Sequence, residues 1–258
     1  MECGTTLDPR IDQELLAVHQ EATKLIPALF EGIQMKMKGS LPDDCARVWL
    51  AYLAAEVYGN ADAAIIAIVH NRGRQAQILE RQLFECITKA EYYINNPDEA
   101  RLEFLALPFR DKKYMDALQV DPTAKKYVAC VNAIDVISKT FPEVPEYAKL
   151  NDSKERPFAQ MLGDMNDPDV RKEYALRYRR KSQTPHGTVV GMFDVLEFSD
   201  TGCIVKFDSR LFDPNLSIAE MTIFLLKFLD LLDQYLGTKR WNEIEVLDGR
   251  LNEIIKRL

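Results

Sequence analysis

Apolar side chains recur at the spacing of a helix along most of the chain. Over residues 11–37 they fall three or four positions apart, and Pro27 interrupts the series with a predicted kink. The same criterion, combined with capping and breaking residues, predicts further helices at 42–58, 61–95, 97–107, 109–118, 122–140, from 167 onward, 184–193, 217–237 and 241–258. This pattern is typical of an all-α protein.

A few residues mark where the predicted helices begin, bend or end. Gly59 ends one predicted helix, Gly73 marks a bend in the next, and Ser217 with Glu220 forms a capping box. Residues 141–156 are rich in proline and polar residues and predict a surface loop. Residues 196–207 contain the only β feature, a hairpin.

We expect a bundle of about eight to ten helices with this hairpin inserted near 196–207. The expected organisation is a single helical domain, 1–258, with N-terminal helices at 1–60, a core bundle at 61–237 and a C-terminal helix at 238–258.

Composition narrows the class of protein. The chain has 258 residues, of which 47% are hydrophobic and 28% charged, and these proportions exclude wholesale disorder. Its net charge of −7 means that a nucleic acid would need a local basic patch. The first ten residues lack the apolar core of a signal peptide, and no segment approaches the roughly 18 apolar residues of a membrane span. We therefore expect a soluble, cytoplasmic protein without membrane contact.

Metal and cofactor motifs are missing from the sequence. Five single cysteines without a Cys-x-x-Cys pair indicate free thiols. Asp164, Asp167 and Asp169 lack the glycine and glutamate of a calcium loop, so we interpret them as a solvated helix start. We predict no metal and no cofactor. His19 is expected at a surface or half-buried position, and His70 in packing or a polar contact.

The most concentrated chemical feature is residues 171–186. Six basic residues and one acid occupy the eleven positions from 171 to 181. Tyr174, Tyr178 and Ser182 follow one another at four-residue spacing and share one helix face. Such a segment predicts either a solvated basic helix with inward tyrosines or a surface for RNA or a nucleotide, to which Arg179 and Arg180 would contribute.

Pro185 determines where His186 is expected within the predicted helices of this segment. Pro185 biases Thr184 away from helical geometry, so Thr184 is expected as the N-cap of a new helix. His186 then lies in its first turn, where the helix dipole disfavours the imidazolium and attracts an anion. The arrangement suits phosphodiester chemistry and a structural kink equally well.

A second constellation lies in the predicted helix at 61–95. Leu83 and Ile87 belong to one apolar face, whereas Arg81 and Glu85 point the opposite way at i, i+4 spacing. Tyr92 lies on this second side, which predicts that the helix is covered on both sides. The ion pair is then partly buried, and it is a candidate ligand-binding feature.

These two constellations resemble a known family. Arg81-Gln82-Leu83-Phe84-Glu85, Tyr92-Tyr93 and Asn96-Pro97-Asp98-Glu99-Ala100 resemble the Arg-x-x-x-Glu helix of bacterial domain-of-unknown-function family 5677, and Tyr174-x3-Tyr178-x3-Ser182-x3-His186-Gly187 is similar to its second block. The resemblance spans 61–237 and implies an α-helical bundle without an established activity.

A more distant likeness concerns HEPN domains. Arg180, with five residues before His186, fits the Arg-x4–6-His spacing of these helical proteins, many of which are dimeric, metal-independent ribonucleases of toxin–antitoxin and antiphage systems. The likeness implies a homodimer in which Arg180 stabilises the phosphorane, His186 transfers protons, and Ser182 lies in the catalytic site.

Three hypotheses remain open, and the sequence leaves undecided whether the protein is an enzyme. The first is a HEPN-like ribonuclease using His186, Arg180 and Ser182. The second is a non-catalytic sensor or partner-binding module, supported by the acidic net charge, the buried-looking Arg81–Glu85 pair and the apolar C-terminal helices. The third is a small-anion or nucleotide pocket lined by Arg81, Glu85, Tyr178 and His186, with Tyr174 and Arg179 beside it.

Overall fold

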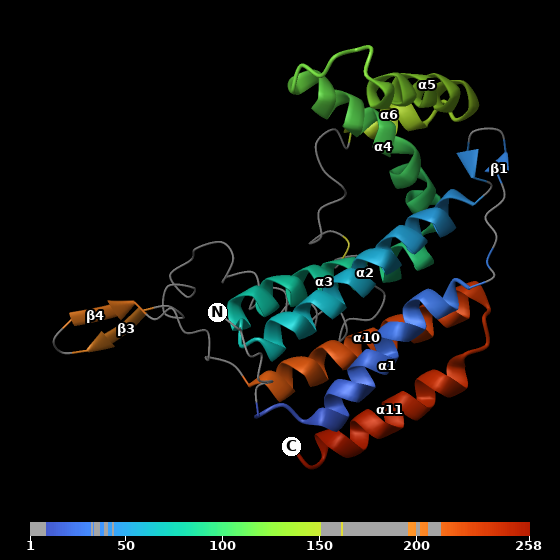
Figure 1. Cartoon of the computed structure of the whole chain (residues 1–258). Helices are drawn as coiled ribbons and strands as arrows, with labels where there is room; N and C mark the ends of the chain where they lie inside the picture. The colour runs from blue at the N-terminus through green and yellow to red at the C-terminus, as the bar shows by residue number, and fades with distance from the viewer. Residues whose placement is uncertain are drawn as a thin grey trace. The chain divides into compact units, whose positions relative to one another are not determined.

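Helices make up almost all of the regular structure. The computed structural model describes residues 9–31, 33, 37–38, 41–42, 44–150, 161, 196–199, 202–205 and 213–258 (Figure 1). Within these ranges there are eight helices: α1 (Gln13–Leu29), α2 (Cys45–Val69), α3 (Gly73–Asn95), α4 (Pro97–Ala117), α5 (Lys125–Thr140), α6 (Val144–Leu150), α10 (Pro214–Leu236) and α11 (Trp241–Ile255). The prediction of an all-α bundle with eight to ten helices is confirmed at this level.

Short strands occur in two antiparallel pairs. β1 (Met37–Lys38) pairs with β2 (Leu41–Pro42), and β3 (Leu196–Ser199) pairs with β4 (Gly202–Val205). In the second pair Leu196 lies opposite Val205 and Ser199 opposite Gly202. The residues on both sides of β3–β4 lie outside the described ranges, so its role as an insertion in the bundle stays a prediction.

The chain divides into two compact units. The first comprises Met1–Glu31, Leu53–Glu91 and Leu162–Leu258, and the second comprises Gly32–Tyr52 and Tyr92–Met161. Each unit is described below by itself. The expected single domain stays a prediction.

In the first unit, α1, α10 and α11 pack against one another (Figure 1). Asp213 caps α10 by accepting from the amides of Asn215 and Leu216. Asn215 in turn accepts from the Asp12 amide at 2.9 Å and so joins the starts of α1 and α10. The edge-to-face rings of Phe84 and Phe224, 4.3 Å apart at their centroids, bring α3 against α10.

His19 lies inside this core, contrary to the expectation of a surface or half-buried position. It is 1% exposed, and its Nδ1 is 3.0 Å from the Thr222 hydroxyl oxygen. That hydroxyl donates to the Ile218 carbonyl, so Nδ1 carries the proton and donates to Thr222. Burial lowers the pKa of His19 to about 4, and a backbone hydrogen bond with Ala61 partly offsets this effect.

In the second unit, α4, α5 and α6 surround a cluster of Cys45, Leu105, Ile137 and Val144. Glu103 is fully buried beside this cluster. Its two oxygens accept from Arg110 Nη1 at 2.6 Å and from the Tyr147 hydroxyl at 2.7 Å, as a buried carboxylate requires. Burial and then the Glu103 carboxylate raise the pKa of Tyr147 far above its usual value.

Several predicted boundaries are wrong because packing outweighs local breakers. α2 continues through Gly59, since Val57 and Ala61 are buried on either side, which offsets a glycine cost of about 1 kcal/mol. α4 continues through Pro108, where Phe104 and Phe109 pack on the core of the second unit. The second and third predicted helices therefore meet at residues 70–72 rather than at Gly59.

Three further predictions need correction. α1 ends at Leu29, two residues after Pro27, instead of continuing to residue 37. α6 occupies part of the predicted loop at 141–156. α10 begins at Pro214, because an aspartate followed by proline is a stronger N-cap than the predicted capping box at Ser217; its predicted end at Gly237 is confirmed, with φ 67°.

α2 also corrects the expectation about membrane spans. Among the helices that the structure describes, it is the one long and apolar enough to cross a membrane by length and composition. The core helix of a soluble protein passes the same test, and α2 buries Leu50, Val57 and Ile68 within the protein.

Protonation of His19 should couple folding to pH. Because its pKa is about 4 in the folded chain and about 6.5 when unfolded, only the unfolded chain takes up this proton between these values, and stability falls as pH falls through that window. We expect the free energy of unfolding of the wild type to fall by about 3 kcal/mol more than that of His19→Gln between pH 7.5 and pH 4. Urea titrations across this range measure the difference, and parallel curves would contradict it.

Candidate functional site

The residues singled out by the sequence fall into two groups. Tyr174, Tyr178, Arg179, Arg180, Ser182 and His186 lie outside the described residues, so their placement and roles stay predictions. Arg81 and Glu85 are described and lie on α3.

α3 is covered on almost all sides. Ala76, Leu83 and Ile87 on its core face are fully buried, and Phe84 beside them is 2% exposed. Of its 23 residues, exposed positions occur only at Arg74, Gln75, Gln82 and Asn95. The expectation of a helix covered on both sides is confirmed, so polar side chains on α3 are largely removed from water.

Arg81 and Glu85 form the ion pair that their spacing predicts. Arg81 Nε donates to Glu85 Oε1 at 3.1 Å, and the two side chains are 17% and 24% exposed. A pair this far from solvent is screened less than a surface pair, yet each ion has lost part of its hydration. Because Glu85 binds Nε, it fixes the plane of the guanidinium.

Thr88 extends this polar face of α3. It lies three residues after Glu85 and seven after Arg81, which puts all three on one side of the helix. Thr88 is fully buried, and its hydroxyl makes no hydrogen bond within the described part of the chain. We call Arg81, Glu85 and Thr88 the polar stripe.

The polar stripe is suited to binding an anion rather than to catalysis. A guanidinium held in one plane and a buried hydroxyl are donors suited to an anion's oxygens. The stripe has no imidazole or thiol, so a proton-transfer group would have to come from elsewhere, such as His186. Within the ranges the structure describes, no three His, Cys, Asp or Glu residues lie together in a way that could hold a metal ion.

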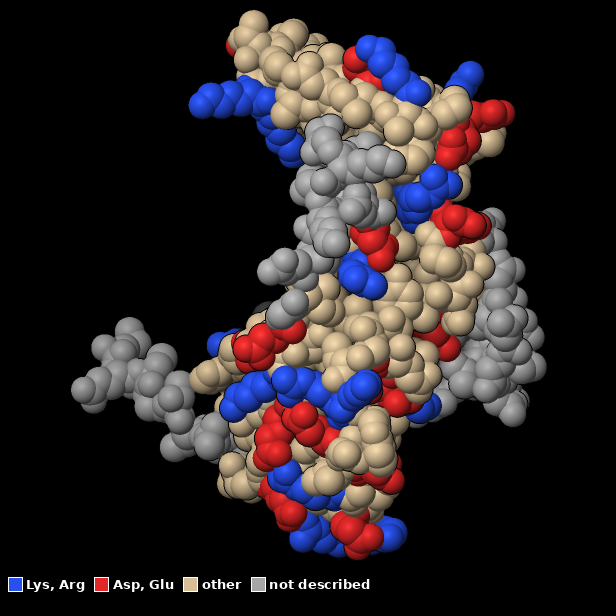
Figure 2. Space-filling view, turned by 90° about the vertical axis from the view of Figure 1, so that its right-hand side faces the viewer, with Lys and Arg blue, Asp and Glu red and all other residues tan. Residues whose placement is uncertain are grey.

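Charged side chains of both signs lie together on one face of the protein. Figure 2 shows Lys and Arg intermingled with Asp and Glu on the face turned to the viewer. On α1 and α11 these charges form exposed pairs, including Arg250–Glu21 at 2.6 Å and Arg257–Glu14. Pairs of this kind contribute little energy and present no net basic surface, so they do not compete with residues 171–186 as a basic patch.

Sequence reasoning missed two of these polar features. Thr88 carries a usable signal, since it continues the i, i+4, i+7 series begun by Arg81 and Glu85. For Glu103, Arg110 stands at the same i+7 spacing on α4, whereas Tyr147, which lies 44 residues further along the chain, gives no local signal.

Comparison with known proteins gives one match. A model described as "Family of unknown function (DUF5677)" matches residues 47–202. This range contains the polar stripe and residues 171–186, and it begins and ends earlier than the resemblance predicted at 61–237. No curated protein and no solved structure matches the chain.

Removing the Thr88 hydroxyl should stabilise the fold. An unbonded buried hydroxyl is costly, so Thr88→Val is expected to raise the free energy of unfolding by about 1 kcal/mol. Thr222→Val is the matched control, because that hydroxyl bonds both His19 and Ile218, and its loss should lower stability by about 1–2 kcal/mol. Urea unfolding of both variants at pH 7.5 is the measurement. Equal destabilisation would show that Thr88 is an ordinary packed residue.

Proposed function

This chain belongs to the DUF5677 family, and from that premise we propose that it binds RNA through the polar stripe and residues 171–186. The observation that carries the proposal is the pairing of Arg81 with Glu85 beside the unbonded hydroxyl of Thr88 on a covered helix. The residues that the family model matches, 47–202, include both the polar stripe and residues 171–186.

The energetics of the stripe support a ligand. Apolar residues at these positions would fold as well or better, since a partly buried ion pair often stabilises less than a hydrophobic replacement. A bound phosphate would accept from the Arg81 guanidinium and would give the Thr88 hydroxyl the hydrogen bond that it lacks within the described part of the chain. Such costly groups are typical of functional sites.

RNA is favoured over a smaller anion by the basic segment. Six cations within residues 171–181 of a chain with net charge −7 concentrate positive charge at one place. Tyr174 and Tyr178 add rings on which unpaired bases can stack. A free nucleotide at Arg81, Glu85, Tyr178 and His186 is the alternative that a competition experiment separates.

The activity we propose is metal-independent cleavage of the HEPN-like type, in a cytoplasmic homodimer that acts as a toxin or in antiphage defence. The 2′-hydroxyl of the RNA would attack the adjacent phosphate, His186 would transfer protons, and Arg180 and Ser182 would donate to the phosphorane oxygens. Arg179 would hold a neighbouring phosphate. The proposal treats the β3–β4 hairpin as an insertion in the bundle and gives it no role in cleavage.

A second candidate, a partner-binding module, is favoured by α5. Val128, Val131 and Val136 are 42%, 40% and 37% exposed, and Ile137 is the buried residue of that helix. Exposed valines on one helix are typical of a docking surface. A partner-binding module needs no catalytic residue.

Binding and cleavage should separate by mutation. We expect the full-length protein to bind a single-stranded RNA oligonucleotide more weakly as salt rises, because phosphate contacts release counterions. Arg81→Gln should weaken binding about tenfold, whereas Gln82→Ala, at an exposed position of α3, should not. His186→Ala should keep binding and lower cleavage about a hundredfold or more, with EDTA without effect. Fluorescence anisotropy and gel analysis of labelled RNA are the readouts.

The outcomes distinguish the candidates. Binding without cleavage, equal for wild type and His186→Ala, would reduce the function to recognition. No RNA binding at low salt, together with association that Val131→Lys abolishes, would favour the partner-binding module. Displacement of RNA by a mononucleotide in an Arg81-dependent way would favour the nucleotide pocket.

A further inference from the structure

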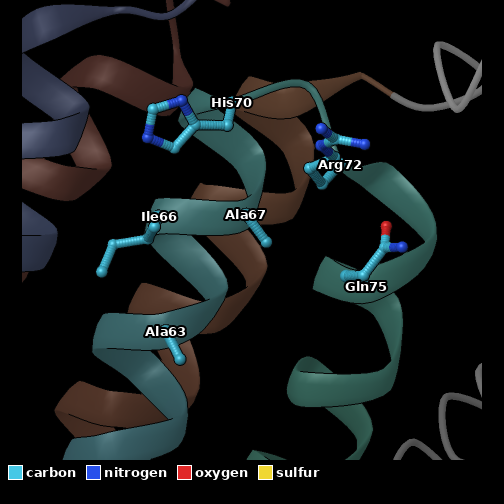
Figure 3. A pocket seen from close by; sticks show the side chains of 6 residues that line it. All are labelled: Ala63, Ile66, Ala67, His70, Arg72 and Gln75. Atoms are coloured by element: carbon cyan, nitrogen blue, oxygen red, sulfur yellow. The ribbon is translucent and has the colours of Figure 1, made fainter. Parts of the chain in front are cut away.

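A second possible site lies at the junction of α2 and α3. A hollow of about 520 Å³, open to solvent, is lined by Ala63, Ile66, Ala67, His70, Arg72 and Gln75 (Figure 3). This volume falls within the range of about 300–1,000 Å³ usual for small-molecule pockets. None of its lining residues belongs to the polar stripe.

The backbone explains why the hollow forms there. α2 closes with hydrogen bonds from the Arg72 amide to the Ala67 carbonyl at 2.7 Å and from the Asn71 amide to Ile68 at 2.8 Å. Asn71 has φ 55°, the left-handed conformation that ends a helix sharply. Ala63 and Ala67 lie one turn apart on α2, and their methyl groups leave space where longer side chains would fill it.

Apolar and polar groups are arranged on different sides of the hollow. Figure 3 shows Arg72 and Gln75 on one side, His70 and Ile66 on the other, and the two alanines between them. Ile66 is 52% exposed, so one wall of the hollow presents uncovered apolar surface. The combination suits a ligand with a flat apolar part and a polar end.

The three polar side chains are available for a ligand. His70, Arg72 and Gln75 are exposed, and none of them makes a side-chain hydrogen bond or ion pair to any residue that the structure describes. Arg72 differs in this respect from Arg81, which Glu85 neutralises. An anion at Arg72 therefore meets a guanidinium without displacing a carboxylate.

We propose that this hollow binds a nucleoside monophosphate, with adenine as the preferred base. The base lies over Ala63 and Ala67, and the Arg72 guanidinium donates two hydrogen bonds to the phosphate oxygens. The Gln75 amide, as both donor and acceptor, matches the N6 and N7 pattern of adenine. His70 lies on the opposite side, which it shares with Ile66 (Figure 3). The site goes beyond the function proposed for the polar stripe and does not rest on it.

The experiment is calorimetric titration of the full-length protein with AMP, UMP, adenosine and inorganic phosphate. AMP should bind more tightly than each of the other three. Arg72→Ala should weaken AMP binding about ten- to a hundredfold, and Ala63→Leu, which fills the hollow with a good helix former, should abolish it. Gln75→Ala should remove the preference for AMP over UMP.

Matched controls identify the site. Arg74→Ala removes the same charge two residues away, and Ala55→Leu makes the same substitution at an exposed position of α2; both should bind AMP as the wild type does. Arg81→Gln should also leave AMP binding unchanged, which separates this site from the polar stripe. The proposal is overturned if AMP does not bind saturably, if phosphate alone binds as tightly, or if Arg74→Ala weakens binding as much as Arg72→Ala. Retained binding in Ala63→Leu would equally overturn it.

Discussion

A helix that is covered on nearly every side must find partners for each polar group that it carries. α3 carries Arg81, Glu85 and Thr88 into such surroundings, next to the buried Leu83 and Phe84. The ion pair satisfies part of this requirement, and the Thr88 hydroxyl remains unbonded in the described part of the chain. The proposal that α3 binds a ligand follows from this imbalance, because stability alone would favour apolar residues at these positions.

The second unit meets the same requirement in a different way. Its buried carboxylate, Glu103, has a partner for each oxygen, from Arg110 and Tyr147. Because both oxygens of the carboxylate are bonded within the protein, the burial of Glu103 needs no ligand to explain it. The contrast with the polar stripe is the reason for assigning recognition to α3 and a structural role to Glu103.

Sequence reasoning predicted the helical class, the end of α10 at Gly237 and the Arg81–Glu85 pair, because each depends on residues within one helical turn or on a local cap. It failed where distant packing decides: α2 passes Gly59 between the buried Val57 and Ala61, and α4 passes Pro108, where Phe104 and Phe109 pack on the core of the second unit. The burial of His19 depends on Thr222, about 200 positions away, and had no local signal. The site at residues 174–186 stays a prediction from sequence, and its connection to α3 is part of the proposal.

On the function proposed above, the polar stripe lowers the stability of the fold and exists for its ligand. The most direct test replaces the whole stripe in one variant, Arg81→Leu with Glu85→Leu and Thr88→Val, and measures both the free energy of unfolding and the affinity for single-stranded RNA. The account predicts a variant at least as stable as the wild type that has lost RNA binding. A variant that is several kcal/mol less stable, or one that binds RNA as the wild type does, would contradict it.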